Sequence, residues 1–153
     1  MFGLDHLFYR IEIIGCQPEN SAVMHESVKA GRIVEKESKP TLADGTAGSI
    51  EKDSLTFEYC REYVDDYVLV SENEIKDAIL LMLEKHFILV EGAAALSIAS
   101  FMKVRQRYNN KNVVLLITGN KISIDTLKAV LSNGYDKFIN RKGRKGYEDK
   151  SIS

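Results

Sequence analysis

The feature that most constrains the fold is the alternation of short apolar runs with longer amphipathic segments. The runs are apolar at every position, as in Tyr67–Val70 and Val113–Ile117. Continuous runs of this kind are typical of strands in a parallel sheet, because the helices between such strands bury both faces of the sheet. The pattern therefore predicts an α/β domain: a three-layer, mostly parallel open sheet with helices on both faces.

Helix signals lie between the runs. After a first strand at 11–15, Asn20 or Ser21 is expected to cap a helix that ends at Gly31. Ser71 and Glu74 have the spacing of a capping box, which predicts the start of an amphipathic helix that reaches about residue 86. The other expected elements are a polar loop at 33–48, helices around 57–64 and 93–108, and a last helix from 123 through 131.

Composition excludes several classes of partner. With 153 residues, a net charge of −1 and 28% charged residues, the chain has the size of one domain and no bias toward nucleic acid or anionic membranes. Cys16 and Cys60 lack the spacing of a disulfide framework or a zinc site. No secretory signal or membrane-spanning segment is visible. We therefore expect a cytoplasmic protein with no nucleic-acid partner and no membrane partner.

The last residues differ from the rest of the chain. Residues 140–153 are basic and glycine-containing, without an apolar pattern. They are expected to form a flexible polar tail, which leaves 1–139 as the folded domain.

Six blocks, taken together in order and spacing, carry a family resemblance. They are Gly15–Ser21, Thr41–Gly48, Thr56–Arg61, Val64–Asp66, Val90–Ala94 and Thr118–Gly119. Over roughly Ile11–Ser123 the chain resembles the threonine/serine dehydratases and their relative serine racemase. The resemblance implies part of the large domain of the tryptophan-synthase-β-like fold, which is fold-type II of pyridoxal 5′-phosphate (PLP) enzymes. It also implies a lyase activity, in which a hydroxy amino acid loses water and then ammonia to give a 2-oxo acid.

The resemblance assigns three residues to the cofactor. The hydroxyl of Thr118 would hydrogen-bond the pyridine nitrogen of PLP, Gly45 would bring its backbone close to cofactor and substrate, and Glu91 would lie near the ring. A neutral hydroxyl does not strongly favour a protonated ring nitrogen, which suits β-elimination. Each residue also has a simpler interpretation without a cofactor. Thr118 could merely end a strand, Gly45 could be a turn glycine, and Glu91 could be a carboxylate that favours a helix N-terminus.

The chain departs from the family pattern in two places. Relatives commonly carry a second glycine after the strand end, where this chain has Asn120. Serine racemase has a divalent-cation site whose carboxylates match Gln17 and Val23 here, so no metal site is expected.

In the family, the lysine that bonds PLP covalently and the glycine-rich phosphate loop precede the first matching block. No catalytic residue is therefore expected in this chain, and Lys121 is interpreted as an exposed turn residue. We interpret the chain as the truncated, C-terminal part of a PLP-dependent ammonia-lyase of amino-acid metabolism. It should be inactive alone and bind cofactor weakly or not at all, until an N-terminal half completes the site for a hydroxy amino acid.

Two other functions remain open. The chain could be a non-catalytic interaction module that associates with a relative, or with itself as a homo-oligomer, through exposed apolar surface. It could also be a ligand-sensing module that keeps a pocket without chemistry. The substrate stays open among serine, threonine and hydroxyaspartate.

Overall fold

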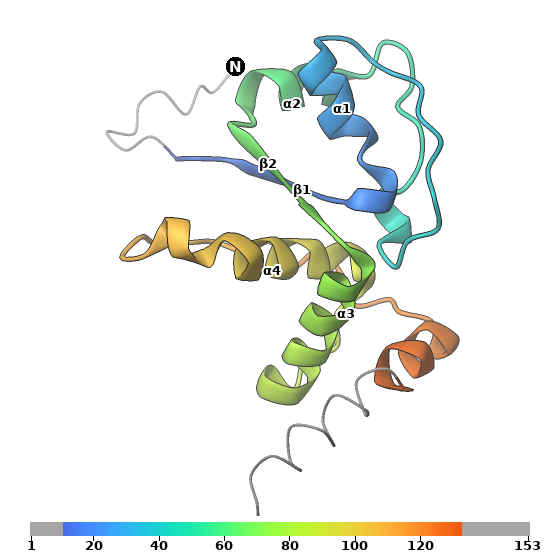
Figure 1. The fold of residues 1–153 in the computed structure, drawn as a ribbon, viewed down its shortest axis with the longest axis vertical. Helices are drawn as coiled ribbons and strands as arrows, with labels where there is room; N and C mark the ends of the chain where they lie inside the picture. The colour runs from blue at the N-terminus through green and yellow to red at the C-terminus, as the bar shows by residue number, and fades with distance from the viewer. Residues whose placement is uncertain (1–10, 133–153) are drawn as a thin grey trace, which may run out of the picture.

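The computed structural model describes residues 11–132. Strands β1 (Ile14–Pro18) and β2 (Asp66–Val70) pair in parallel. Helices α1 (Val23–Ala30) and α2 (Leu55–Tyr63) lie on one side of the pair, and α4 (Gly92–Val104) lies on the other (Figure 1). Helix α3 (Glu72–Leu81) follows β2 and packs against α4. The shorter elements are 3₁₀ turns at Glu19–Ser21, Asp44–Thr46 and Arg105–Tyr108, a π-helical end of α3 at Met82–His86, and a helix over 124–132.

Side chains of the two strands alternate between the two helical layers. Tyr67 points toward α1, where its ring lies 5.5 Å from that of His25, measured between centroids. Gly15 is opposite Tyr67 in the pairing, and a Cβ atom there would lie 2.4 Å from the tyrosine ring. A side chain at position 15 would therefore collide with the ring, which explains the glycine.

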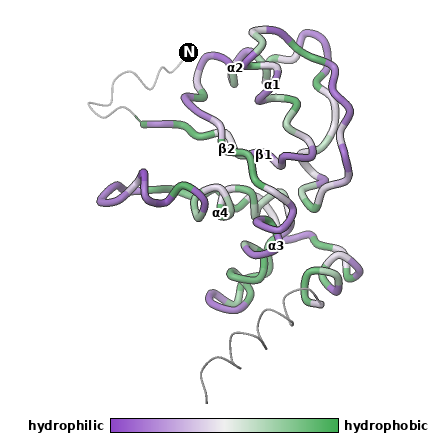
Figure 2. Tube along the Cα trace, in the orientation of Figure 1, coloured by the Kyte–Doolittle hydropathy of each residue, from purple (hydrophilic) through white to green (hydrophobic). Residues whose placement is uncertain are grey.

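The core lies between the strand pair, α3 and α4. Its buried residues include Val68, Val70, Ile75, Ile79, Val90, Leu96 and Val130. Figure 2 shows hydrophobic residues along β2 and over much of α4, whereas long stretches of the connection between α1 and α2 are hydrophilic. The small residues of α4, such as Ala94, Ala95 and Ala99, are almost fully buried. They let this helix approach the strands closely.

Several local predictions are confirmed. Helix α1 ends at Gly31, which has a left-handed φ of 67°. The capping box is formed: the side chain of Ser71 accepts the backbone N–H of Glu74, whose carboxylate accepts the backbone N–H of Ser71. Helix α2 and strand β2 also lie where the sequence predicts them.

The predicted cap of α1 is wrong. The N-cap residue is Ala22, because Glu19–Ser21 forms a 3₁₀ turn before the helix begins. The side chains expected to cap the helix bind the following loop: Asn20 donates to the carbonyl of Pro40, and the hydroxyl of Ser21 pairs with that of Ser38. The first strand also begins later than expected, at Ile14.

The predicted strand at 113–117 does not pair with another strand within residues 11–132, where the sheet has two strands. The segment runs beside α4, and the hydroxyl of Ser97 donates to the carbonyl of Leu116. Leu115 packs against the core, while Val114 and Leu116 are 84% and 72% exposed. The sequence has the composition of a buried strand, but within the described residues the segment is unpaired and largely exposed.

Within 11–132, no helix is both long and apolar enough to cross a bilayer. The predicted tail at 140–153 and the end of the predicted 1–139 domain lie outside the described residues.

Candidate functional site

Three segments that are far apart in sequence meet at the N-terminus of α4. They are the loop at 41–46, the start of α4 at 91–93, and the turn at 118–121. A Cβ atom on Gly45 would lie 3.6 Å from the Cβ of Ala93. The backbone N–H of Glu91 donates to the carbonyl of Gly119, at 3.2 Å. The structure therefore brings the neighbourhoods of all three predicted cofactor residues to one end of one helix.

Glu91 is the N-cap residue of α4, but its carboxylate does not bind the N–H groups of its own helix. Instead, Oε2 accepts the backbone N–H of Lys121, at 3.1 Å. A Cβ atom on Gly119 would lie 2.6 Å from Oε1 of the same carboxylate. The half-buried Glu91 side chain thus fills the space that a side chain at position 119 would need.

The loop at 41–46 is held by the first residues of α3 and α4. Oε2 of Glu72 accepts the backbone N–H of Leu42, at 2.7 Å. The carbonyl oxygen of Leu42 lies where a Cβ atom on Gly92 would be, only 1.9 Å away. The backbone of the loop therefore lies directly against that of α4, which is possible because residue 92 has no side chain.

Gly45 lies in the 3₁₀ turn Asp44–Thr46 and is exposed. Its N–H donates to Oδ1 of Asp44, at 2.9 Å, and the hydroxyl of Thr46 donates to the carbonyl of Ala43, at 2.8 Å. These local bonds fix the turn while leaving the surface above Gly45 open.

Thr118 is exposed and makes no side-chain hydrogen bond within residues 11–132. Leu116 and Val114, two and four residues before it, are also exposed. An uncharged hydroxyl free to donate or accept fits a pyridine nitrogen. Contact of Thr118, Gly45 and Glu91 with PLP stays a prediction.

Lys103 of α4 is a residue that the sequence reasoning missed. Its Nζ atom donates to the carbonyl of Leu69 at 2.8 Å, to Oε2 of Glu74 at 3.1 Å and to Oε1 of Glu19 at 3.4 Å. Burial lowers the pKa of Lys103, but its bonds to the two carboxylates outweigh burial and raise it. No local spacing reveals this contact, because the three acceptors are distant from Lys103 in sequence.

The pKa of Glu74 shifts for related reasons. Burial raises it, but the hydrogen bonds from Ser71 and Lys103 outweigh burial and hold the pKa below its ordinary value. The capping box and the Lys103 contact therefore share one carboxylate at the carboxyl end of β2.

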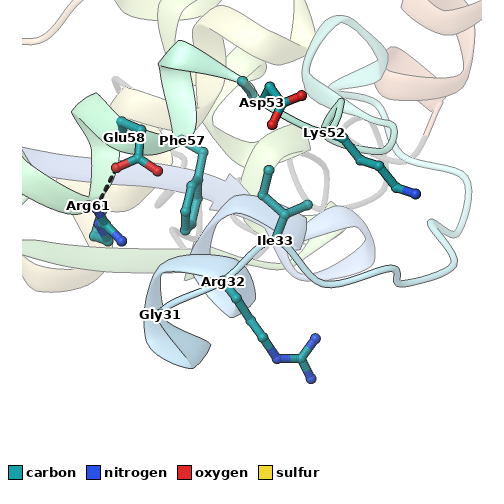
Figure 3. A pocket seen from close by; sticks show the side chains of 9 residues that line it. Gly31, Arg32, Ile33, Lys52, Asp53, Phe57, Glu58 and Arg61 are labelled. Carbon is teal, nitrogen blue, oxygen red and sulfur yellow. Dashed lines mark hydrogen bonds and ion pairs between the residues drawn. The ribbon is translucent and has the colours of Figure 1, made fainter.

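A separate open hollow of about 620 Å³ lies between the end of α1 and the start of α2. Phe57 and Ile33 line it, while the side chains of Arg32 and Lys52 extend away from it (Figure 3). Arg61 is paired with Glu58 at its edge. None of the predicted cofactor residues lines this hollow.

The geometry agrees with comparisons to known proteins. The family described as "Pyridoxal-phosphate dependent enzyme" matches residues 1–119, and the chain belongs to this family. The L-threonine ammonia-lyase of Thermotoga maritima is 39% identical over 127 residues, which cover 83% of this chain and 31% of that protein. The catabolic L-threonine dehydratase TdcB of Escherichia coli K12 is 36% identical, over 78% of this chain and 37% of its own length.

Solved structures show the same fold. The processed form of threonine deaminase isoform 2 from Solanum lycopersicum superposes with a TM-score of 0.72 at 29% identity, over 79% of this chain and 36% of that one. Maize serine racemase, at 24% identity, has a TM-score of 0.68 over 81% of this chain and 39% of its own. The resemblance to dehydratases and serine racemases is thus confirmed, and the structure is a partial fold-type II structure. The chain spans about a third of the length of the curated relatives named above.

Proposed function

We propose that this chain is the C-terminal portion of a PLP-dependent threonine/serine dehydratase of the cytoplasm, active only when an N-terminal portion joins it. The observation that carries the proposal is the meeting of 41–46, 91–93 and 118–121 at the N-terminus of α4. These segments contain Gly45, Glu91 and Thr118, the residues that the resemblance assigns to the cofactor. A dehydratase site needs these residues close together, and the contacts between their segments support that arrangement.

The unpaired segment at 113–117 supports the need for a second portion. Val114 and Leu116 are 84% and 72% exposed, and exposed apolar residues on an unpaired extended segment favour pairing with another chain. We infer that the N-terminal portion places a strand beside this segment. The sheet would then become the three-layer, mostly parallel open sheet of the complete large domain.

When bound, PLP would supply the electron withdrawal that weakens bonds at the substrate's α-carbon. The residues of this chain would hold and orient it: the Thr118 hydroxyl would hold the ring nitrogen, and the backbone at Gly45 would leave room for a close approach. Glu91 would lie near the ring. The lysine that bonds PLP covalently and the phosphate loop would come from the N-terminal portion, so this chain alone would bind cofactor weakly and have no catalytic residue of its own.

A second candidate function is a non-catalytic interaction module. The exposed apolar face of 113–117 favours association, whether the partner is an N-terminal portion, a relative or a second copy of this chain. In that case the segment would form the interface, and the convergence at α4 would have no chemical role.

Co-expression separates the two functions. The chain would be produced with the part of the Thermotoga maritima ammonia-lyase that precedes the matched region, and 2-oxo acid formation would be measured with L-threonine, L-serine and hydroxyaspartate. The dehydratase proposal expects product from the pair, none from either part alone, and a large loss with Thr118→Val. A stable pair that forms no product from any of the three would refute it and favour the interaction module.

A further inference from the structure

We propose that Glu91 is a positioning residue, whose carboxylate fixes the turn at 118–121 and thereby orients the hydroxyl of Thr118. The identity of the group that Thr118 contacts rests on the proposed function. The contact between Glu91 and the turn is a property of this chain alone.

Two hydrogen bonds from one residue hold the turn. The backbone N–H of Glu91 donates to the carbonyl of Gly119 at 3.2 Å, and its carboxylate accepts the N–H of Lys121 at 3.1 Å. On the other side of Thr118, the hydroxyl of Ser97 donates to the carbonyl of Leu116 at 2.9 Å. Thr118 therefore lies between two points at which α4 holds the backbone, which restricts the directions its side chain can take.

Glycine at position 119 is required by the carboxylate. A Cβ atom there would lie 2.6 Å from Oε1 and 2.7 Å from Cδ of Glu91. Backbone conformation does not demand a glycine, because the glycines with positive φ in residues 11–132 are Gly31 and Gly48. Alanine at 119 should therefore push out the flexible carboxylate and leave the backbone in place. Gly119 and Glu91 act as a pair.

The position of Glu91 at the start of α4 favours this role. The first N–H groups of a helix carry a partial positive charge, which favours a carboxylate nearby. The Glu91 side chain does not bind those N–H groups. The carboxylate oxygens of Glu91 are therefore available to accept hydrogen bonds from the turn. A glutamine at 91 would keep one acceptor oxygen but lose the negative charge.

Amide hydrogen exchange in the 153-residue chain tests the contact without cofactor. Glu91→Ala should speed exchange at the Lys121 amide by roughly tenfold, as expected for loss of one hydrogen bond to a carboxylate. Glu91→Gln should restore most of the protection. Gly119→Ala should match Glu91→Ala, and the double variant should be no faster than Glu91→Ala alone, since no carboxylate is left to displace. Glu51→Ala, which removes an exposed carboxylate elsewhere, is the control.

The second readout is PLP itself, in the co-expressed pair. Glu91→Ala and Gly119→Ala should each weaken PLP affinity by about tenfold and shift its visible absorbance, and Glu91→Gln should restore both. Unchanged exchange at Lys121 in Glu91→Ala would overturn the proposal. Faster exchange with unchanged PLP affinity and absorbance would also overturn it, because the turn would then not orient Thr118. If the unmodified pair binds no PLP, the proposed function fails and the orienting role fails with it, while the exchange data still show whether the contact exists.

Discussion

Gly92→Ala is the substitution whose effect the structure determines most directly. In a helix, alanine is favoured over glycine by up to about 1 kcal/mol, so propensity alone predicts stabilisation. The added Cβ atom, however, would lie 1.9 Å from the carbonyl oxygen and 2.4 Å from the carbonyl carbon of Leu42. Both are backbone atoms that cannot rotate away, so the loop at 41–46 must move. Overpacking costs about 1–3 kcal/mol, and because this clash is with backbone atoms at 1.9 Å we expect about 2–3 kcal/mol, which exceeds the propensity gain.

Thermal unfolding measures the result. A net loss of about 1–2 kcal/mol in the free energy of unfolding corresponds to a decrease of about 2–8 °C in Tm for a chain of this size. Gly45→Ala is the matched control from the same contact region, because its Cβ would meet Ala93 at an ordinary 3.6 Å. We expect that variant to change stability by less than about 0.5 kcal/mol. Equal melting temperatures for the two variants would refute the close backbone contact between the loop and α4.

Because the pKa of Glu74 is below its ordinary value of 4.5, its contribution to stability is present above that value and is lost as pH falls through the lower, folded-state pKa. Glu74→Gln should therefore lose less stability than the unmodified chain in melts between pH 7 and pH 3, and parallel losses would contradict this. Replacing both Val114 and Leu116 by lysine should reduce self-association, measured by sedimentation at high concentration. Tm should not fall, since both side chains are mostly exposed. Unchanged association would exclude this face as the interface. Gln17→Ala should lower the free energy of unfolding by about 1 kcal/mol, because Oε1 of Gln17 accepts the backbone N–H of His25 at 2.7 Å. An unchanged Tm would show that this hydrogen bond does not stabilise the fold.

Features set by neighbouring residues were predictable from the sequence. The capping box at Ser71 needs two residues three positions apart, and the end of α1 at Gly31 needs one residue that tolerates positive φ. The cap of α1 was not predictable in this way. Asn20 and Ser21 have the right side chains, but the loop at 38–40 offers them other partners, which local sequence does not reveal.

The segment at 113–117 shows a different limit of prediction from sequence. Its apolar composition predicts a buried strand, but Val114 and Leu116 are mostly exposed, and Leu115 packs on the core. Strand pairing, however, depends on a neighbour, and within residues 11–132 this segment pairs with no strand. The pattern of a segment predicts its propensity for a strand, whereas pairing also depends on residues far away in the sequence.

The candidate site was predictable only through the resemblance. Nothing in the spacing of Gly45, Glu91 and Thr118 indicates that their segments meet. The structure adds the contacts that bring them together, including the fit of the Glu91 carboxylate against Gly119. That fit depends on two residues 28 positions apart in the sequence, so neither residue alone could signal it.

The ammonium group of Lys103 has an evolutionary consequence. It satisfies oxygens from β2, from α3 and from the turn after β1 at the same time. A mutation that removes the cation would take one donor from each of these acceptors in a single step, although Glu74 would keep its bonds from Ser71, and no change in any one acceptor would compensate. As related sequences diverge, position 103 should therefore be among the slowest to vary on this helix, although it contacts no predicted ligand.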